Sequence, residues 1–263
     1  MQSRVRAYLI GAGFLAITLP LMPVQALLVR FAPGAARRLP HWYHRMVCRL
    51  IGLSFATEGS IARDVPVLIV ANHASWLDIP LLSAVAPVSF VAKKEVAGWP
   101  FVATLARLQR TVFVDRERRS KVGETAGEIL ERLNAGDCIV LFAEGTSSDG
   151  NRVLPFKTSL FAAVKPGVAN GSVLRQQAVV QTVSIAYTRR RGLPLGWAGR
   201  RAFGYYGDIG MGANAWDVLA GGPVEARISI GAPVAFSSFA DRKELARRSE
   251  IAVREGVVAS LRK

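Results

Sequence analysis

Residues 67–78 read VLIVANHASWLD, and this stretch decides the fold class. Its first five residues (67–71) form a short continuous apolar run, which is typical of a strand buried on both faces of a sheet. Pro66 stands just before the run, where a missing amide proton does little harm to a strand. A polar turn and a helix-like segment follow at once. This order predicts an α/β protein whose chemistry lies just after the strand.

The same alternation of apolar strands and helix-like segments continues toward the carboxyl terminus. Further strands are predicted at residues 89–92, 111–114, 138–142, 179–186 and 225–230, and helices at 116–133 and 241–261. Residues 192–222 are rich in Gly, Trp and Tyr and are predicted to form a long loop with one short helix near Trp216. We therefore expect an α/β fold with a partly parallel sheet flanked by helices.

The composition excludes several classes of protein. The chain has 263 residues, of which 51% are hydrophobic, and its formal net charge is +15. It is too apolar and too evenly mixed to be disordered. Its two cysteines lie far apart and form no CxxC pair, which excludes a disulfide framework and a cysteine-rich zinc site. A basic chain with a mean hydropathy of +0.26 favours an anionic membrane surface as partner over nucleic acid.

The apolar excess is concentrated near the amino terminus. Residues 8–29 carry no charge and would form a helix roughly 33 Å long, enough to cross a bilayer core. Pro20 and Pro23 are expected to break the helix in its second half, and arginines flank both ends. Three readings stay open: a re-entrant or half-buried helical pair, a true span, and a removed signal peptide. No small-x-small cleavage site follows convincingly, which weakens the last of them.

A second helix is predicted over residues 39–53, where aromatic and aliphatic residues alternate with His and Arg. This amphipathic pattern suits a membrane interface, although an ordinary capping helix of the main domain would show it too. We therefore divide the chain into a membrane-associated helical arm (1–55) and an α/β domain (56–263).

His73 and Asp78 in the turn after the first strand can work as a pair. If a helix starts near Ser75, the Asp78 carboxylate can fold back onto one ring nitrogen of His73. A carboxylate bonded there fixes the tautomer and makes the other nitrogen a better base toward an alcohol. Alternatively, the same residues form only an N-cap cluster at a helix start.

Two more strand ends carry polar residues. The strand at 138–142 runs into Ala-Glu-Gly-Thr-Ser-Ser-Asp-Gly (143–150), where Gly145 permits a tight turn and hydroxyl groups follow it. Arg116 stands where the strand at 111–114 stops, a natural place to hold a phosphate or a carboxylate. Taken alone, the segment 143–150 could be a loop without a function, and Arg116 could belong to a solvent-exposed run of charged residues.

Together these motifs are far more specific than any one of them. They occur as Asn-His-x-x-x-x-Asp, Phe-Val-Asp-Arg and Phe-x-Glu-Gly-Thr, in that order, at residues 72–78, 113–116 and 142–146. This series closely resembles the glycerolipid acyltransferase family, whose best-known members are bacterial 1-acyl-glycerol-3-phosphate acyltransferases. The resemblance covers roughly residues 40–235. It implies transfer of an acyl chain from acyl-CoA or acyl carrier protein to a lysolipid hydroxyl, without a metal or other cofactor.

Carried over by position, the resemblance makes His73 the general base and Asp78 the residue that orients it. The residues it places in or near the acceptor site are Asn72, Ser75, Arg116, Glu144, Gly145, Thr146, Ser147 and Lys157. It also implies an enzyme bound through its amino-terminal arm to the cytoplasmic face of the bacterial inner membrane, with membrane lipids as partners and no nucleic acid.

The sequence departs from the family pattern at two positions. Phosphatidate-forming members usually have Arg after Glu-Gly-Thr, where this chain has Ser147, and a Pro near Val183, where it has Thr182. Ser cannot supply a charge to an acceptor phosphate. The longer string at 144–157 resembles the lyso-ornithine lipid acyltransferase branch, whose acceptor carries an amino acid and no phosphate. A lysophospholipid O-acyltransferase is the main prediction, and a lyso-ornithine lipid O-acyltransferase is the alternative, since Lys157, Arg116 or Arg152 could still bind a phosphate.

Other classes fit less well. A basic non-enzymatic membrane- or nucleic-acid-binding protein remains a distant alternative, but the basic residues are dispersed and form no nucleic-acid-binding motif. A metal hydrolase would need more ligands than the pair His41 and His44 offers. An esterase would need a nucleophile elbow of the Gly-x-Ser-x-Gly type, which does not occur.

Overall fold

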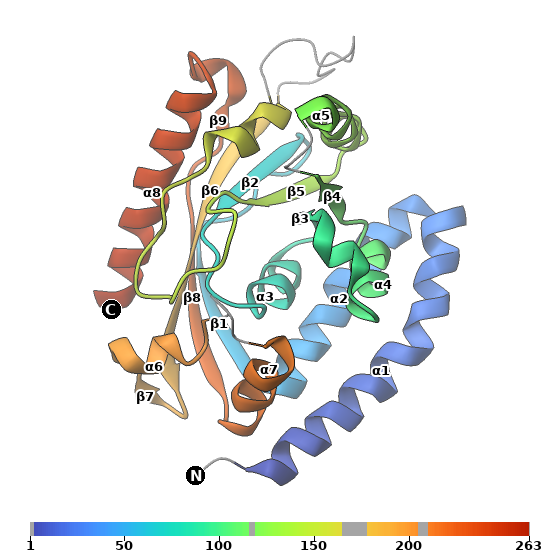
Figure 1. The fold of residues 1–263 in the computed structure, drawn as a ribbon, viewed down its shortest axis with the longest axis vertical. Coiled ribbons are helices and arrows are strands. Elements are labelled where there is room, and N and C mark those ends of the chain that lie inside the picture. The colour runs from blue at the N-terminus through green and yellow to red at the C-terminus, as the bar shows by residue number, and fades with distance from the viewer. Residues whose placement is uncertain (1–2, 116–118, 165–177, 205–209, 263) are drawn as a thin grey trace.

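A computed structural model describes residues 3–115, 119–164, 178–204 and 210–262, and the statements below concern these residues (Figure 1). The strands are β1 (Leu53–Glu58), β2 (Val67–Ala71), β3 (Val88–Lys93), β4 (Val112–Val114), β5 (Cys138–Phe142), β6 (Val179–Arg190), β7 (Leu193–Pro194), β8 (Val224–Ile230) and β9 (Val234–Ala235). The α-helices are α1 (Arg4–Phe31), α2 (Pro33–Ile51), α3 (Asp78–Val85), α4 (Val102–Leu108), α5 (Arg119–Asn134), α6 (Trp197–Arg201), α7 (Met211–Ala220) and α8 (Arg242–Arg262). Three short 3₁₀ helices are η1 (Lys94–Gly98), η2 (Thr158–Val164) and η3 (Phe236–Ser238).

The strands form one sheet in the order β1-β8-β6-β2-β5-β3-β4, with β7 and β9 paired to β6. Neighbours along this order are parallel except β8 and β6, so the predicted α/β fold with a partly parallel sheet is confirmed. Ala71 of β2 pairs with Phe142 of β5. The loops that follow these two strands therefore leave the same edge of the sheet side by side.

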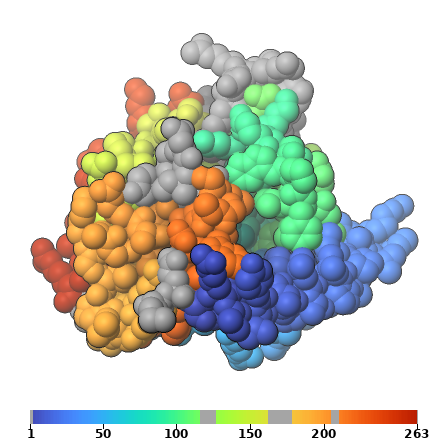
Figure 2. Space-filling view, turned by 60° about the horizontal axis from the view of Figure 1, so that its bottom comes forward, coloured from blue at the N-terminus to red at the C-terminus, as the bar shows by residue number. Residues whose placement is uncertain are grey.

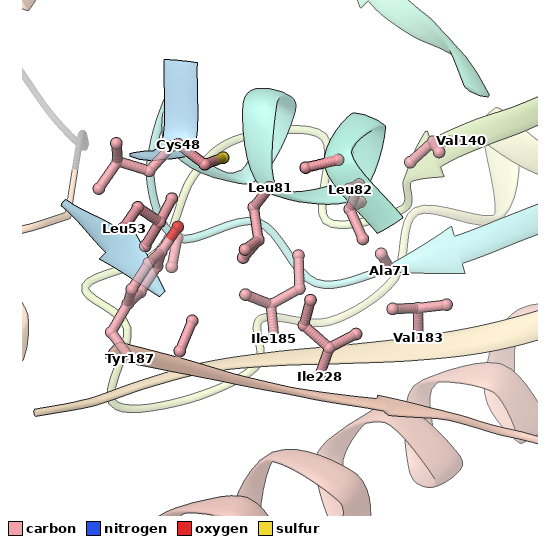
Figure 3. Close-up of a cluster of buried hydrophobic side chains, with 14 of the residues drawn as sticks. Cys48, Leu53, Ala71, Leu81, Leu82, Val140, Val183, Ile185, Tyr187 and Ile228 are labelled. Carbon is pink, nitrogen blue, oxygen red and sulfur yellow. The ribbon is translucent and has the colours of Figure 1, made fainter. Parts of the chain in front are cut away.

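Helices cover both faces of the sheet (Figure 1). In β2, Val67, Ile69 and Ala71 pack toward α2 and α3, while Leu68 and Val70 pack toward α5 and α8. This alternation follows from the two-residue period of a strand, and it explains why the whole of β2 is apolar. Figure 3 shows the first of these two clusters, in which Leu81 and Leu82 of α3 lie over β2 and β6.

The amino-terminal arm is a pair of packed helices, α1 and α2. The expected break at Pro20 and Pro23 is wrong, because α1 continues through both prolines to Phe31. Each proline removes one backbone hydrogen bond, and packing along one side of the helix offsets that loss. The helix predicted at 39–53 begins earlier, at Pro33, and ends at Ile51, where Gly52 takes a left-handed conformation (φ 74°) and the chain enters β1.

α1 has two unlike sides. Ala7, Ile10, Thr18 and Gln25 are buried against the rest of the molecule, while the opposite side exposes Val5, Tyr8, Leu9, Leu15, Leu19, Val24, Leu27 and Phe31. The helix is long and apolar enough to cross a membrane, the one such helix in the part of the chain that the structure describes.

The segment predicted as a long loop at 192–222 contains more regular structure than expected. The short helix around Trp216 is confirmed as α7, but β7 and α6 precede it. Both missed elements are very short, and β7 exists only through pairing with the end of β6, which runs on to Arg190. Residues 205–209 lie outside the described part of the chain.

Candidate active site

The loops after β2 and β5 are tied together directly. The backbone amide of Ser148 donates to the carbonyl of His73 at 2.7 Å, and the amide of His73 donates to Oε1 of Glu144 at 2.9 Å. The parallel pairing of the two strands brings these loops together, and the hydrogen bonds fix their spacing. The structure thus joins two motifs that are about 70 residues apart in the sequence.

His73 and Asp78 form the predicted pair. Nδ1 of the imidazole lies 2.8 Å from Oδ2 of Asp78, which also accepts the amides of Ala74 (2.7 Å) and Ser75 (2.9 Å). The Asp78 side chain is fully buried, whereas the His73 side chain is 20% exposed. Helix α3 begins at Asp78 itself, three residues later than expected, so the carboxylate caps the turn that carries the histidine. This arrangement places the ring proton on Nδ1 and leaves Nε2 able to accept a proton.

The imidazole ring is also held by stacking. It lies 4.1 Å from the ring of Phe142, at an interplanar angle of 17°, and Phe90 stacks behind Phe142 at 6.1 Å. Phe142 is the last residue of β5. The same strand therefore sets the orientation of the histidine ring and leads into the Glu-Gly-Thr turn.

Glu144 lies beneath this loop and is 1% exposed. Its second carboxyl oxygen accepts the amide of Leu154 at 3.0 Å, so the side chain links the His73 loop to the 153–157 segment. Burial raises the pKa of Glu144 to about 8, and the nearby Asp78 and Glu250 add to the rise, while the two backbone hydrogen bonds oppose it. In this position the side chain supports the loop and does not line the cavity.

A cavity of about 970 Å³ opens beside His73. Its wall includes His73, Gly145, Thr146 and Ser147, a few further polar residues such as Lys93 and Glu95, and many apolar residues of α1, α2, α4 and α7. Figure 2 shows the surface hollowed between α1, α4 and α7. Gly145 has a φ of 70°, which turns the chain so that the next two residues face this space.

The remaining candidate residues that the structure describes do not line the cavity. Asn72 bonds both backbone groups of Ile185 on β6, at 3.0 and 2.8 Å, and so fastens the end of β2 to the neighbouring strand. Ser75 is fully buried, and its hydroxyl accepts the amide of Leu77 at 3.3 Å. Lys157 is exposed and lies outside the cavity lining. Arg116 lies outside the described residues.

Sequence reasoning missed two contacts of the pair. Phe142 was noted as a strand end and as the first residue of a motif, without a role beside His73. Tyr187 of β6 was not singled out, although its hydroxyl lies 2.6 Å from Oδ1 of Asp78. The available signal for Tyr187 was its two-residue spacing from Ile185 and Val183, but the predicted strand ended at residue 186, before the tyrosine. No local pattern indicates which residue the tyrosine would meet, 109 positions away.

Fold and site together define an α/β acyltransferase. The Acyltransferase family model matches residues 53–186, half of the chain, and the chain belongs to this family. A lyso-ornithine lipid O-acyltransferase of Brucella abortus (strain 2308) is 44% identical over 97% of this chain and 94% of its own length. A 1-acyl-sn-glycerol-3-phosphate acyltransferase of Neisseria meningitidis is 30% identical over 72% of this chain and 68% of its own length. The resemblance drawn from the motifs is thereby confirmed, and the protein is an O-acyltransferase.

The crystal structure of the 1-acyl-sn-glycerophosphate acyltransferase from Thermotoga maritima superposes with a TM-score of 0.68. The match covers 97% of this chain and 93% of that one, at 24% identity. This likeness concerns the fold and includes the amino-terminal helices, since it spans nearly the whole chain.

Proposed function

We propose that this acyltransferase uses His73 as a general base to acylate the free hydroxyl of lyso-ornithine lipid, with an acyl thioester as donor. The observation that carries the proposal is the bond between Nδ1 of His73 and the buried Asp78 carboxylate, which leaves Nε2 as the free nitrogen of a ring that lines the cavity. A general base so placed is worth about 10²–10⁴ in rate.

The reaction needs one proton transfer in each direction. Nε2 of His73 takes the proton of the acceptor hydroxyl as its oxygen attacks the thioester carbonyl carbon. The carbon–sulfur bond then breaks, the ester is released, and the imidazolium returns the proton to the leaving thiolate. Asp78 stabilises the imidazolium that forms between these steps. The balance requires no redox partner, metal or other cofactor.

The apolar part of the cavity suits the acyl chain of the donor. Its volume lies within the range of ligand pockets, about 300–1,000 Å³. The lining residues of α1 and α4, such as Phe14, Leu21, Val102 and Leu105, offer no charge to a hydrocarbon chain. The thioester carbonyl of acyl-CoA or acyl carrier protein would then lie at the polar end, next to His73.

Two features favour an amino-acid head group over a phosphate in the acceptor. Ser147, which lies on the cavity wall, replaces the arginine that would pair with a phosphate. Lys93 and Glu95 also line the cavity, are exposed, and carry opposite charges. The ornithine head group carries one carboxylate and one ammonium, so these two side chains match its charges. Four relatives at 34–44% identity are named lyso-ornithine lipid O-acyltransferases.

The exposed apolar side of α1 supports attachment to a bilayer. Its residues face away from the domain along most of the helix, while the buried side of the same helix helps to form the cavity. A helix with one side on the domain and one side in lipid would bring the cavity to the membrane surface. We place the enzyme on the cytoplasmic face, where acyl-CoA and acyl carrier protein occur.

An acceptor panel tests the proposal. Membranes that contain the wild-type protein or the variant His73→Ala receive labelled acyl donor and either lyso-ornithine lipid or lysophosphatidic acid. His41→Ala is the matched control, because His41 bonds the backbone of Ser83 on α3 and lies outside the cavity lining. We expect transfer to lyso-ornithine lipid that His73→Ala abolishes and His41→Ala retains. Preference for lysophosphatidic acid would overturn the acceptor assignment, and full activity of His73→Ala would overturn the mechanism.

A further inference from the structure

The Asp78 carboxylate accepts four hydrogen bonds, and they divide unevenly between its oxygens. Oδ2 receives His73 and the amides of Ala74 and Ser75, whereas Oδ1 receives the hydroxyl of Tyr187 at 2.6 Å. Within the described part of the chain, Tyr187 is the one donor recorded for Oδ1. A buried carboxylate needs donors on both oxygens, because each unpaired charged group in an interior carries a large desolvation penalty.

Packing on several sides fixes the position of the Tyr187 hydroxyl. The side chain stands on the same side of β6 as Ile185 and Val183, facing α3 (Figure 3), and it is 3% exposed. Its ring stacks on the ring of Phe203, with the two centroids 5.9 Å apart. The guanidinium of Arg190 in turn lies over the Phe203 ring, 4.7 Å from its centroid. Strand geometry on one side and this stack on the other leave the phenol little freedom to turn away from Asp78.

We propose that Tyr187 is a positioning residue of the active site, which orients the Asp78 carboxylate and sets the basicity of His73 by drawing charge toward Oδ1. The assignment of His73 as the base rests on the proposed function, but the effect of Tyr187 on the imidazole does not. A donor bonded to a charged group stabilises that charge. The bond at Oδ1 therefore weakens the hydrogen bond between the imidazolium and the carboxylate. Loss of the Tyr187 hydroxyl would strengthen that hydrogen bond and stabilise the protonated ring.

The tyrosine remains a donor throughout the working range of pH. Burial, together with the charge of Asp78, raises the pKa of Tyr187 well above its ordinary value. The phenol therefore keeps its proton, and its hydroxyl is always the donor in the hydrogen bond to the carboxylate.

Among the residues that the structure describes, few other ionisable groups face this cluster. Glu144 approaches from the end of β5 through the backbone of His73, and Cys48 approaches Tyr187 from α2. Burial raises the pKa of Cys48 to about 12, so this thiol stays neutral. Lys93 and Glu95 lie on the wall of the cavity that His73 also lines. Since burial raises the pKa of Glu144 to about 8, the test is read below pH 7, where this side chain stays protonated.

The test compares Tyr187→Phe with Ser184→Ala. Ser184 lies on the same strand but faces α8, where its buried hydroxyl donates to the carbonyl of Val253 at 2.9 Å. Each variant loses one buried hydroxyl and one hydrogen bond, but only Tyr187→Phe touches Asp78. The full-length protein in detergent micelles is titrated by NMR on the His73 ring signals, and kcat/KM is measured against pH.

We expect the midpoint of the His73 titration to move to higher pH in Tyr187→Phe by roughly one unit or less, and the acid limb of kcat/KM to move with it. The variant should also lose about tenfold in kcat with little change in KM. Ser184→Ala should lose thermal stability and leave the midpoint in place. An unchanged midpoint in Tyr187→Phe, or an equal shift in both variants, would overturn the proposal.

Two further measurements keep the outcome clear. If Tyr187→Phe fails to fold, 3-fluorotyrosine installed at position 187 retains the bond with a stronger donor, and the His73 midpoint should then move to lower pH. An unchanged midpoint would count against the proposal. If the midpoint shifts as expected but His73→Ala keeps full activity, the proposed function fails while the link between Tyr187 and His73 stands.

Discussion

Replacement of Asp78 by asparagine is the sharpest test of the pair. Asn keeps the size of the side chain and removes its charge. The amide oxygen can still accept the backbone amides of Ala74 and Ser75, but the imidazolium loses its counter-charge at 2.8 Å. An amide NH₂ group turned toward the ring would also favour the wrong imidazole tautomer, with the proton on Nε2.

The expected size of the effect follows from these losses. A hydrogen bond to a charged group is worth about 1.5–3 kcal/mol, which corresponds to roughly 10–150-fold in rate. A wrong tautomer would add to this, up to the complete loss of general-base assistance, about 10²–10⁴-fold. We therefore expect Asp78→Asn to lower kcat by about 10²–10³-fold, with KM for donor and acceptor nearly unchanged.

The assay is initial-rate transfer of labelled acyl groups in mixed micelles, with thermal unfolding measured on the same samples. Asp64→Asn is the matched control, because Asp64 is exposed and its φ of 62° is tolerated by asparagine as well. If Asp78→Asn kept activity within threefold of wild type while folding normally, the carboxylate would not assist His73 and the proposed mechanism would be wrong.

Three further predictions concern other parts of the molecule. Because burial raises the pKa of Glu144 to about 8, the free energy of unfolding should fall as pH rises from about 5 to 8, by at most about 1.4 kcal/mol per unit. Denaturant titrations should show that Glu144→Gln lacks this decline. If the free energy of unfolding fell equally with pH in the wild type and the variant, Glu144 would not be its cause. Asn72→Ala should cost about 1–3 kcal/mol in chemical denaturation, since it leaves the buried amide and carbonyl of Ile185 unpaired, and a loss below 0.5 kcal/mol would count against that role. Leu19→Arg combined with Leu27→Arg should reduce sedimentation with anionic vesicles several-fold, because both side chains are exposed on the apolar side of α1, and unchanged sedimentation would refute membrane contact there.

Much of the site could be predicted because its parts are local in sequence. The runs at 67–71 and 138–142 are apolar throughout, and each ends in a polar turn, so their strand boundaries match the structure. The contact between His73 and Asp78 spans five residues and follows from a turn before a helix. The meeting of the two turns follows from the rule that parallel strands present their carboxyl ends at one edge.

The remainder depends on contacts that no local pattern encodes. Tyr187 reaches Asp78 only because β6 pairs with β2, and Asn72 turns to Ile185 for the same reason. β1 was missed because only its first residue, Leu53, is buried, so no apolar run or alternation marks the strand, and the helix predicted over 39–53 extended to that residue. Side-chain direction is also nonlocal, which is why Lys157 could be proposed near the acceptor yet lies outside the cavity lining.

The central claim is that His73 removes the proton of the acceptor hydroxyl, and the most direct measurement is the rate of acyl transfer to lyso-ornithine lipid by His73→Ala. The account predicts a loss of about 10²–10⁴-fold in kcat, with vesicle binding and thermal stability close to those of wild type. Transfer at the wild-type rate by the folded, membrane-bound variant would contradict the account.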